Sequence, residues 1–188
     1  MKKLAFEALD SALRPGVTYA DVRLVESRER DLSTKNGKPS QVSSSESAGL
    51  GIRVLAEGCW GFAATDDLSK AGVESAAALA VEIARSSALA KKSDVVLAPE
   101  DKYEATWASP CQIDPFSVSV DEQLALLLRI DAELRRNSGV TLAHTSMVFH
   151  RERRRFRCSQ FSWGRDPKAI VSEFVRRAAS VEGVRADS

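Results

Sequence analysis

Histidine and cysteine are scarce in this chain of 188 residues, which has two histidines and three cysteines. Cys59, Cys111 and Cys158 are odd in number and widely spaced, which argues against a disulfide framework and fits a reducing cytoplasm. With only His144 and His150 as imidazole ligands, the sequence also offers little material for a metal site.

A strong charge bias and a long apolar run are missing as well. The formal net charge is +1, so the chain as a whole gives no electrostatic reason to bind nucleic acid. No apolar run approaches the roughly 18 residues that a transmembrane helix needs. Glu7 and Asp10 interrupt the apolar segment that an export signal would require after Met1-Lys2-Lys3. We therefore expect a cytoplasmic protein that binds neither nucleic acid nor a membrane.

Apolar side chains recur at helical spacing in three segments, and this predicts three main helices. The third begins with Ser119-Val120-Asp121-Glu122, a capping box. A further short helix is expected from Asp166 to Val181, where an aspartate cap precedes Pro167 at the first helical position. The main helices are expected at residues 4–13, 69–90 and 119–136.

Several short strands are predicted between these helices. Asn36-Gly37 is a strong hairpin signal, and Glu57-Gly58 is expected to turn the next pair of strands. Residues 140–149 form a further strand-like segment, and residues 156–158 are interpreted as the returning arm of a hairpin. The strands of the first meander are expected at residues 19–25, 41–42, 51–55 and 60–63.

These elements predict an α+β fold, in which an antiparallel sheet is packed by helices and a second helix-plus-hairpin unit is incomplete. An amino-terminal α+β domain is expected at residues 1–98. A linker at residues 99–118 contains three prolines and shows no periodicity. The second unit is expected to start at residues 119–163, and a basic tail to occupy residues 164–188.

A weak internal repeat links the two parts of the chain. Gly16-Val17-Thr18-Tyr19-Ala20 is similar to Gly139-Val140-Thr141-Leu142-Ala143, and in the same register Arg28-Glu29-Arg30 matches Arg151-Glu152-Arg153. Both segments follow a predicted helix. A duplicated helix-strand-strand unit explains this similarity, and so does chance likeness between two helix-to-strand junctions.

The histidines do not form a recognisable metal motif. A zinc peptidase needs two or three converging ligands and a carboxylate, usually with two histidines one helical turn apart. His144 and His150 lie instead on one predicted strand, separated by roughly 20 Å at ~3.3 Å per residue. We interpret both as partly exposed strand residues.

Other catalytic patterns fail in the same way. His144 and Ser146 would share one face of a strand, but no G-x-S-x-G elbow surrounds the serine. Cys59 follows the turn at Gly58 and precedes Trp60, which favours a small core residue over a nucleophile. Gly49-Leu50-Gly51 lacks the third glycine of a dinucleotide loop and leads into a strand. No catalytic, cofactor-binding or metal-binding residue is therefore assigned.

Two polar runs allow more than one interpretation. The serines at residues 43–47 could be a phosphorylation target or a flexible linker, but a polar edge strand with its turn explains them and is favoured. The arginine run could contact phosphates or recruit an acidic partner together with the basic tail. A solvated hairpin tip that protects a sheet edge is favoured instead. The run consists of Arg151, Arg153, Arg154, Arg155 and Arg157.

An ordered series of segments carries a resemblance to a known family. Residues 19–26 (YADVRLVE), residues 49–55 (GLGIRVL) and residues 58–65 (GCWGFAAT) follow one another at the expected places, and Asp114-Pro115-Phe116 comes later. Over residues 4–161 the chain resembles the amino-terminal region of TldD/PmbA proteins, a family of metallopeptidases also described as modulators of DNA gyrase.

The resemblance implies a zinc peptidase that processes peptides such as a microcin leader, and a partner subunit in a homo- or heterodimer. In that family the zinc is held by an HExxxH helix downstream of the matched region. This sequence contains no HExxxH, so no catalytic residue is carried over and no cofactor is assigned to this chain. We expect a truncated or frameshifted member that is inactive alone and supplies a cavity wall or a subunit interface.

Overall fold

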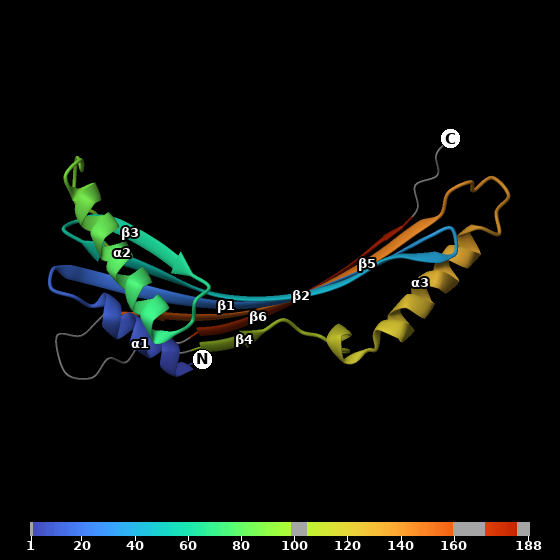
Figure 1. The fold of residues 1–188 in the computed structure, drawn as a ribbon, viewed down its shortest axis with the longest axis horizontal. Helices are drawn as coiled ribbons and strands as arrows, with labels where there is room; N and C mark the ends of the chain where they lie inside the picture. The colour runs from blue at the N-terminus through green and yellow to red at the C-terminus, as the bar shows by residue number, and fades with distance from the viewer. Residues whose placement is uncertain (1, 99–104, 160–171, 184–188) are drawn as a thin grey trace. The chain divides into compact units, whose positions relative to one another are not determined.

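The computed structural model describes residues 2–98, 105–159 and 172–183, and within them it shows helices packed on a sheet (Figure 1). This confirms the predicted α+β fold. The helices are α1 (Lys2–Ala12), α2 (Lys70–Ala88), the short 3-10 helix η1 (Pro115–Ser117) and α3 (Val120–Leu134). The strands are β1 (Val17–Lys35), β2 (Lys38–Ala56), β3 (Cys59–Thr65), β4 (Ala105–Ala108), β5 (His144–Cys158) and β6 (Ser172–Gly183).

The strands lie in the order β3-β2-β1-β5-β6-β4. Strands β2 and β3 are antiparallel, with Leu50 opposite Thr65 and Ala56 opposite Cys59. Strands β1 and β5 are antiparallel too, because Asn36 donates to the carbonyl of Ala143 while the amide of Ser159 donates to the carbonyl of Ala20. Both hydrogen bonds imply the same residue-by-residue alignment of β1 with β5.

Two tight turns form the β1-β2 and β2-β3 hairpins where the sequence predicts them. Asn36 and Gly37 have φ values of 48° and 77°, and Glu57 and Gly58 have φ values of 52° and 74°. Positive φ at both central residues defines the turn that matches the twist of adjacent strands, and asparagine and glycine adopt it at little cost. These two turns therefore set the register of the first three strands.

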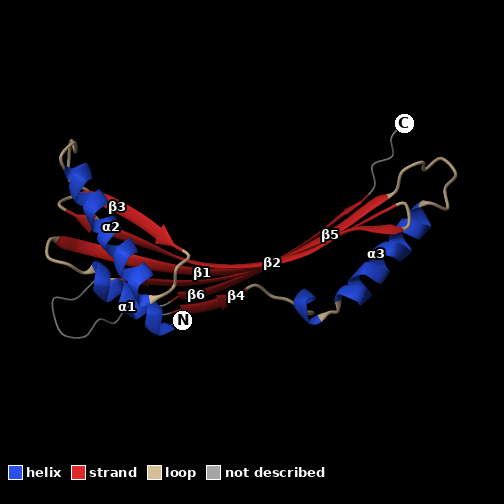
Figure 2. Cartoon of the chain, viewed as in Figure 1, coloured by secondary structure: helices blue, strands red, loops and turns tan. Residues whose placement is uncertain are grey.

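The chain divides into two compact units, and β1 and β2 contribute to both. The first unit contains α1, α2, β3, residues 17–26 of β1 and residues 48–56 of β2. Helices α1 and α2 pack against each other, and α2 packs on β3 (Figure 2). The buried core contains Val22 and Leu24 of β1, Ile52 and Val54 of β2, and a stripe of alanines and valines on α2.

The second unit contains η1, α3, residues 27–35 of β1, residues 38–47 of β2 and residues 144–152 of β5. Its apolar core is smaller and consists of Leu32, Leu127, Met147 and Phe149. Helix α3 also buries two polar side chains toward the sheet, Gln123 and Asp131. Polar contacts therefore hold much of this unit together.

One predicted hairpin is absent. Residues 144–158 form the single strand β5 instead of two arms that turn within the arginine run. A tight turn requires residues that tolerate positive φ, and the run between Arg151 and Arg155 contains neither glycine nor asparagine. Arg155 pairs with Glu26 at 2.6 Å, so this charge lies against the neighbouring strand and not at a solvated tip.

The helix expected from Asp166 to Val181 is also wrong where the structure can test it. Residues 172–183 form strand β6, and residues 166–171 lie outside the described part. Strand β6 lies between β5 and β4 and pairs with both, and this pairing outweighs the helical preference of the alanines and arginines in β6. The linker expected at residues 99–118 also contains regular structure, namely β4 and η1. No helix within the described residues is long and apolar enough to span a membrane.

Candidate functional site

Phe116 lies in η1, immediately before α3, and its position is set by the residues beside it. The Asp114 carboxylate accepts a hydrogen bond from the backbone N–H of Phe116 at 3.1 Å, and Pro115 takes the first position of the turn. An aspartate cap followed by proline favours a short, well-defined turn. The sequence thereby holds the aromatic ring against the sheet.

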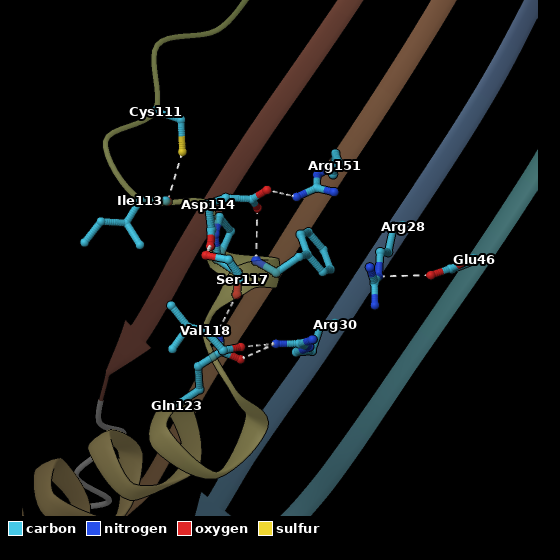
Figure 3. Close-up of polar contacts among 12 residues, drawn as sticks. Arg28, Arg30, Glu46, Cys111, Ile113, Asp114, Ser117, Val118, Gln123 and Arg151 are labelled. Carbon is cyan, nitrogen blue, oxygen red and sulfur yellow. Dashed lines mark hydrogen bonds and ion pairs between the residues drawn. The ribbon is translucent and has the colours of Figure 1, made fainter.

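Three arginine side chains contact this ring, and Figure 3 shows Arg28 and Arg30 on one strand and Arg151 on another. The guanidinium carbons of Arg28, Arg30 and Arg151 lie 4.9, 5.3 and 4.8 Å from the ring centroid. Arg28 and Arg30 are two residues apart on β1 and so project to the same face, while Arg151 comes from β5. All three distances lie within the ~6 Å range of cation–π attraction. We call these three residues and Phe116 the arginine cluster.

Arg30 is the buried member of the arginine cluster, with 7% of its surface exposed. Its Nη1 donates to the carbonyl of Val118 at 3.0 Å and to Oε1 of Gln123 at 2.8 Å. The amide nitrogen of Gln123 in turn donates to the carbonyl of Pro115 at 2.7 Å. This chain of hydrogen bonds fixes both the start of α3 and the guanidinium of Arg30.

The arginine cluster carries more positive than negative charge. Nε of Arg28 lies 3.0 Å from Oε1 of Glu46 on β2, and Arg151 pairs with the carboxylate of Asp114. Within the described part of the chain, two carboxylates therefore pair with a group of three guanidinium groups. Nε of Arg30 and Nε of Arg151 are buried and have no hydrogen-bond partner among the described residues. A guanidinium nitrogen buried without a partner is costly.

A second polar network lies under the other end of α3. Thr34 and Thr145 share a hydrogen bond of 2.6 Å between their hydroxyls, and Thr34 Oγ1 lies 3.2 Å from Oδ2 of Asp131. Asp131 is fully buried and forms an ion pair of 2.6 Å with Arg135. These contacts tie α3 to β1 and, through the hydroxyl pair of Thr34 and Thr145, to β5.

The first unit has a polar cluster on the sheet face opposite α1 and α2. Asp21 is 1% exposed and pairs with Arg53 at 2.6 Å, and the guanidinium of Arg53 stacks on Trp60 at 4.5 Å. Burial, together with the nearby charge of Asp21, raises the pKa of Tyr19 far above its usual range. Tyr19 therefore stays protonated at any physiological pH and is unsuited to act as a base.

The outer edge of β2 is open over much of its length. Strand β3 pairs only with residues 50–56, so within the described residues no strand lies beyond residues 38–49. Residues 38–47 are all exposed, and they include the serine run at residues 43–47. The serines thus lie on an edge strand, as predicted. Such an edge presents unpaired backbone N–H and C=O groups to another chain.

A comparison with protein-family models supports the resemblance seen in the sequence. Residues 20–84 match the first domain of the PmbA/TldA metallopeptidases. Over these residues the amino-terminal region is similar to the PmbA/TldA family. The matched residues run from β1 through the meander into α2, which are the segments that carry the resemblance in the sequence.

Curated relatives agree with this assignment. A metalloprotease from Methanothermobacter thermautotrophicus is 46% identical over 56 residues, which make up 30% of this chain and 12% of the relative. A metalloprotease from Methanocaldococcus jannaschii is 24% identical over 125 residues, or 66% of this chain and 28% of the relative. The chain thus matches less than a third of either relative.

Solved structures share the fold. A protein from Bacteroides thetaiotaomicron described as a modulator of DNA gyrase superposes with a TM-score of 0.70 at 18% identity, covering 95% of this chain and 38% of that one. TldE from Thermococcus kodakarensis gives a TM-score of 0.66 at 16% identity, covering 98% and 39%. A Thermotoga maritima protein, also described as a modulator of a DNA gyrase, gives a TM-score of 0.66 at 16% identity, covering 96% of this chain and 42% of that one.

The zinc that the PmbA/TldA family implies does not fit the side chains that the structure describes. His144 is exposed at the start of β5, and His150 is half-buried six residues later on the same strand. No three histidine, cysteine, aspartate or glutamate side chains within the described ranges form a group that could hold a metal ion. We therefore derive no catalytic step through a metal in this chain.

The other residues considered from the sequence lie apart from one another. Ser146 is half-buried on β5, and Cys59 is a half-buried free thiol at the start of β3. Gly51 lies within β2 beneath the ring of Phe62, where an added Cβ would lie 3.0 Å from Cε2. The glycine pair therefore belongs to the sheet and not to a phosphate loop.

Sequence reasoning missed most of the arginine cluster. It singled out Arg151 within a charged run and noted Arg28-Glu29-Arg30 only as part of a repeat. The signal was the spacing, because arginines at positions i and i+2 of a strand project from one face. The partner ring, Phe116, could not be paired with them from sequence, since it lies on a separate segment 86 or more positions away.

Proposed function

We propose that these residues form the peptide-binding amino-terminal part of a TldD/PmbA-type peptidase, and that they do not cleave peptides alone. The family match over residues 20–84 and the two relatives named metalloproteases support a role in proteolysis. In this proposal, the metal ligands and the catalytic carboxylate come from polypeptide outside these 188 residues.

The open edge of β2 carries the peptide-binding part of the proposal. Residues 38–47 are exposed and have no strand beyond them within the described chain. An extended peptide that pairs with such an edge gains main-chain hydrogen bonds, and its side chains alternate between the two faces. Half of the side chains at residues 38–47 are serines, which are small and polar, so an added strand meets little steric hindrance there.

The proposal includes a partner subunit of the same family, in a homo- or heterodimer, and a cytoplasmic location. The three cysteines are free thiols, which suits a reducing compartment. Mixing the purified chain with a full-length family member and measuring co-elution tests the partner. Separate elution at concentrations well above those in the cell would argue against a subunit interface.

Backbone-modified peptides test the binding mode. A short fluorescent peptide should bind the chain, and the same peptide with N-methyl groups on alternate residues should not, because methylation along one edge removes the N–H donors that strand pairing needs. The side chains stay identical, which makes the two peptides a matched pair. Equal binding of both would contradict strand addition at β2.

A cleavage assay tests the second half of the proposal. The purified chain, supplied with zinc, should leave labelled peptides intact, whereas addition of a complete family member should produce cleavage. Chelator-sensitive hydrolysis by the chain alone would show that it holds a functional metal site and would refute the proposed division of labour.

A further inference from the structure

We propose that the arginine cluster around Phe116 is a carboxylate-binding site, which takes an acidic side chain or the terminal carboxylate of a peptide. The inference extends the proposed function, because it assumes that the ligand is a peptide. It adds a preference for acidic peptides and names the residues responsible for it.

Electrostatic imbalance is the first argument for a carboxylate ligand. The register of β1 and β5 places Arg28 directly opposite Arg151. Like charges in such a cross-strand pair destabilise a sheet. Arg30 adds a third positive charge on the same face, and among the side chains that the structure describes, the carboxylates paired with the three are those of Glu46 and Asp114. A bound carboxylate would bring the charge of the arginine cluster to balance.

The division between buried and exposed arginines is the second argument. Arg30 is buried and held by Val118 and Gln123, so its charge is fixed behind the ring. The side chains of Arg28 and Arg151 are 38% and 27% exposed, so both can reach a ligand from solvent. Phe116 contacts both guanidinium groups and limits their movement. A pre-positioned arginine fork suits the two oxygens of a carboxylate.

A substitution of Glu46 should change ligand affinity in the opposite direction to a substitution of Arg28. Its side chain is 69% exposed, and it contacts Arg28 from the open-edge strand β2. An exposed ion pair of this kind contributes only ~0–1 kcal/mol, so a ligand carboxylate can compete with it. Removing the charge of Glu46 should therefore strengthen ligand binding, while removing the charge of Arg28 should weaken it.

The test uses three short fluorescent peptides of one neutral sequence. One carries a central glutamate and an amidated end, the second has glutamine in its place, and the third has glutamine with a free terminal carboxylate. The glutamate peptide should bind the full chain about tenfold more tightly than its glutamine counterpart, a difference of ~1.4 kcal/mol. The third peptide shows whether a terminal carboxylate is accepted instead.

The variants assign the preference to the arginine cluster. Arg28→Gln should abolish the difference between the acidic and neutral peptides, and Glu46→Gln should enlarge it. Arg129→Gln, which removes an exposed arginine of α3, is the matched control and should change neither affinity. Higher salt should reduce the preference, because it screens exposed charges.

The outcomes separate this inference from the proposed function. Equal binding of acidic and neutral peptides, still abolished by N-methylation, would overturn the carboxylate site and leave strand addition standing. Failure of every peptide to bind would refute the proposed function, and the inference with it. A lower melting temperature in Arg28→Gln with an unchanged acidic preference would show that the arginine cluster only anchors η1.

Discussion

Gly61 of β3 lies directly against Ala80 of α2. A Cβ atom added at Gly61 would collide with the carbonyl oxygen of Ala80 and lie 2.6 Å from the backbone nitrogen of Ala84. The helix backbone thus packs on the strand at a point where no side chain fits. The alanines on this face of α2 permit the same close approach.

Gly61→Ala should therefore destabilise the first unit. The methyl group meets backbone atoms, which cannot rotate away, so α2 has to shift from the sheet. Overpacking of this kind costs ~1–3 kcal/mol. Urea unfolding followed by circular dichroism measures the loss as a lower midpoint.

Gly49→Ala is the matched control for this experiment. Gly49 also lies in a strand, but its added Cβ would meet only the carbonyl oxygen of Thr65, at 3.5 Å, an ordinary contact distance. We expect stability to change by less than about 0.5 kcal/mol, in either direction. Similar losses in both variants would mean that strand glycines matter for reasons other than contact with α2.

Asn36 combines two roles that different substitutions can separate. It adopts a positive φ in the β1-β2 turn, and its Oδ1 accepts a hydrogen bond of 2.8 Å from the backbone N–H of Ala143. Asn36→Gly keeps the backbone conformation and loses the hydrogen bond, which should cost ~1 kcal/mol. Asn36→Ala loses both and should cost about 1 kcal/mol more. Thermal unfolding of the two variants ranks them, and equal losses would exclude a contribution from the backbone conformation.

The capping box of α3 should make stability depend on pH. Hydrogen bonds from the hydroxyl and backbone N–H of Ser119 lower the pKa of Glu122. A carboxyl group with a lowered folded-state pKa stabilises the protein above its unfolded pKa of ~4.3, and the effect is lost as the pH falls through the folded value. Glu122→Gln should therefore lower the melting temperature at neutral pH, and the difference should vanish in acid. A difference that persists at low pH would point to packing instead.

Local signals account for the parts of the fold that were predicted correctly. Alanine and valine at helical spacing identified α2, a capping box identified the start of α3, and Asn36-Gly37 identified the first hairpin, because each depends on neighbours within a few residues. Strand β6 was missed because its conformation comes from pairing with β4 and β5. Intrinsic preference is weaker than such tertiary pairing.

The arginine cluster shows the same limit at the level of the site. The sequence favours a solvated hairpin tip for the arginine run, whereas in the structure Arg151 contacts Phe116 and Arg155 pairs with Glu26. Charge patterning shows how many arginines are present, whereas their partners depend on the register between β1 and β5. In the weak repeat Arg28 corresponds to Arg151, and the structure brings these two residues to the same ring.

Asp131 and Arg135 provide a test of how charge is held in the second unit. Asp131 is fully buried, whereas the side chain of Arg135 is 41% exposed. Arg135→Ala leaves a buried carboxylate without its counter-charge, which should cost ~2 kcal/mol or more. Adding Asp131→Asn should recover most of that loss, because a neutral amide needs no counter-charge and can still accept the hydrogen bond from Thr34. Urea unfolding of both single variants and the double variant gives the coupling energy. Strictly additive losses would mean that the ion pair contributes nothing beyond its separate side chains.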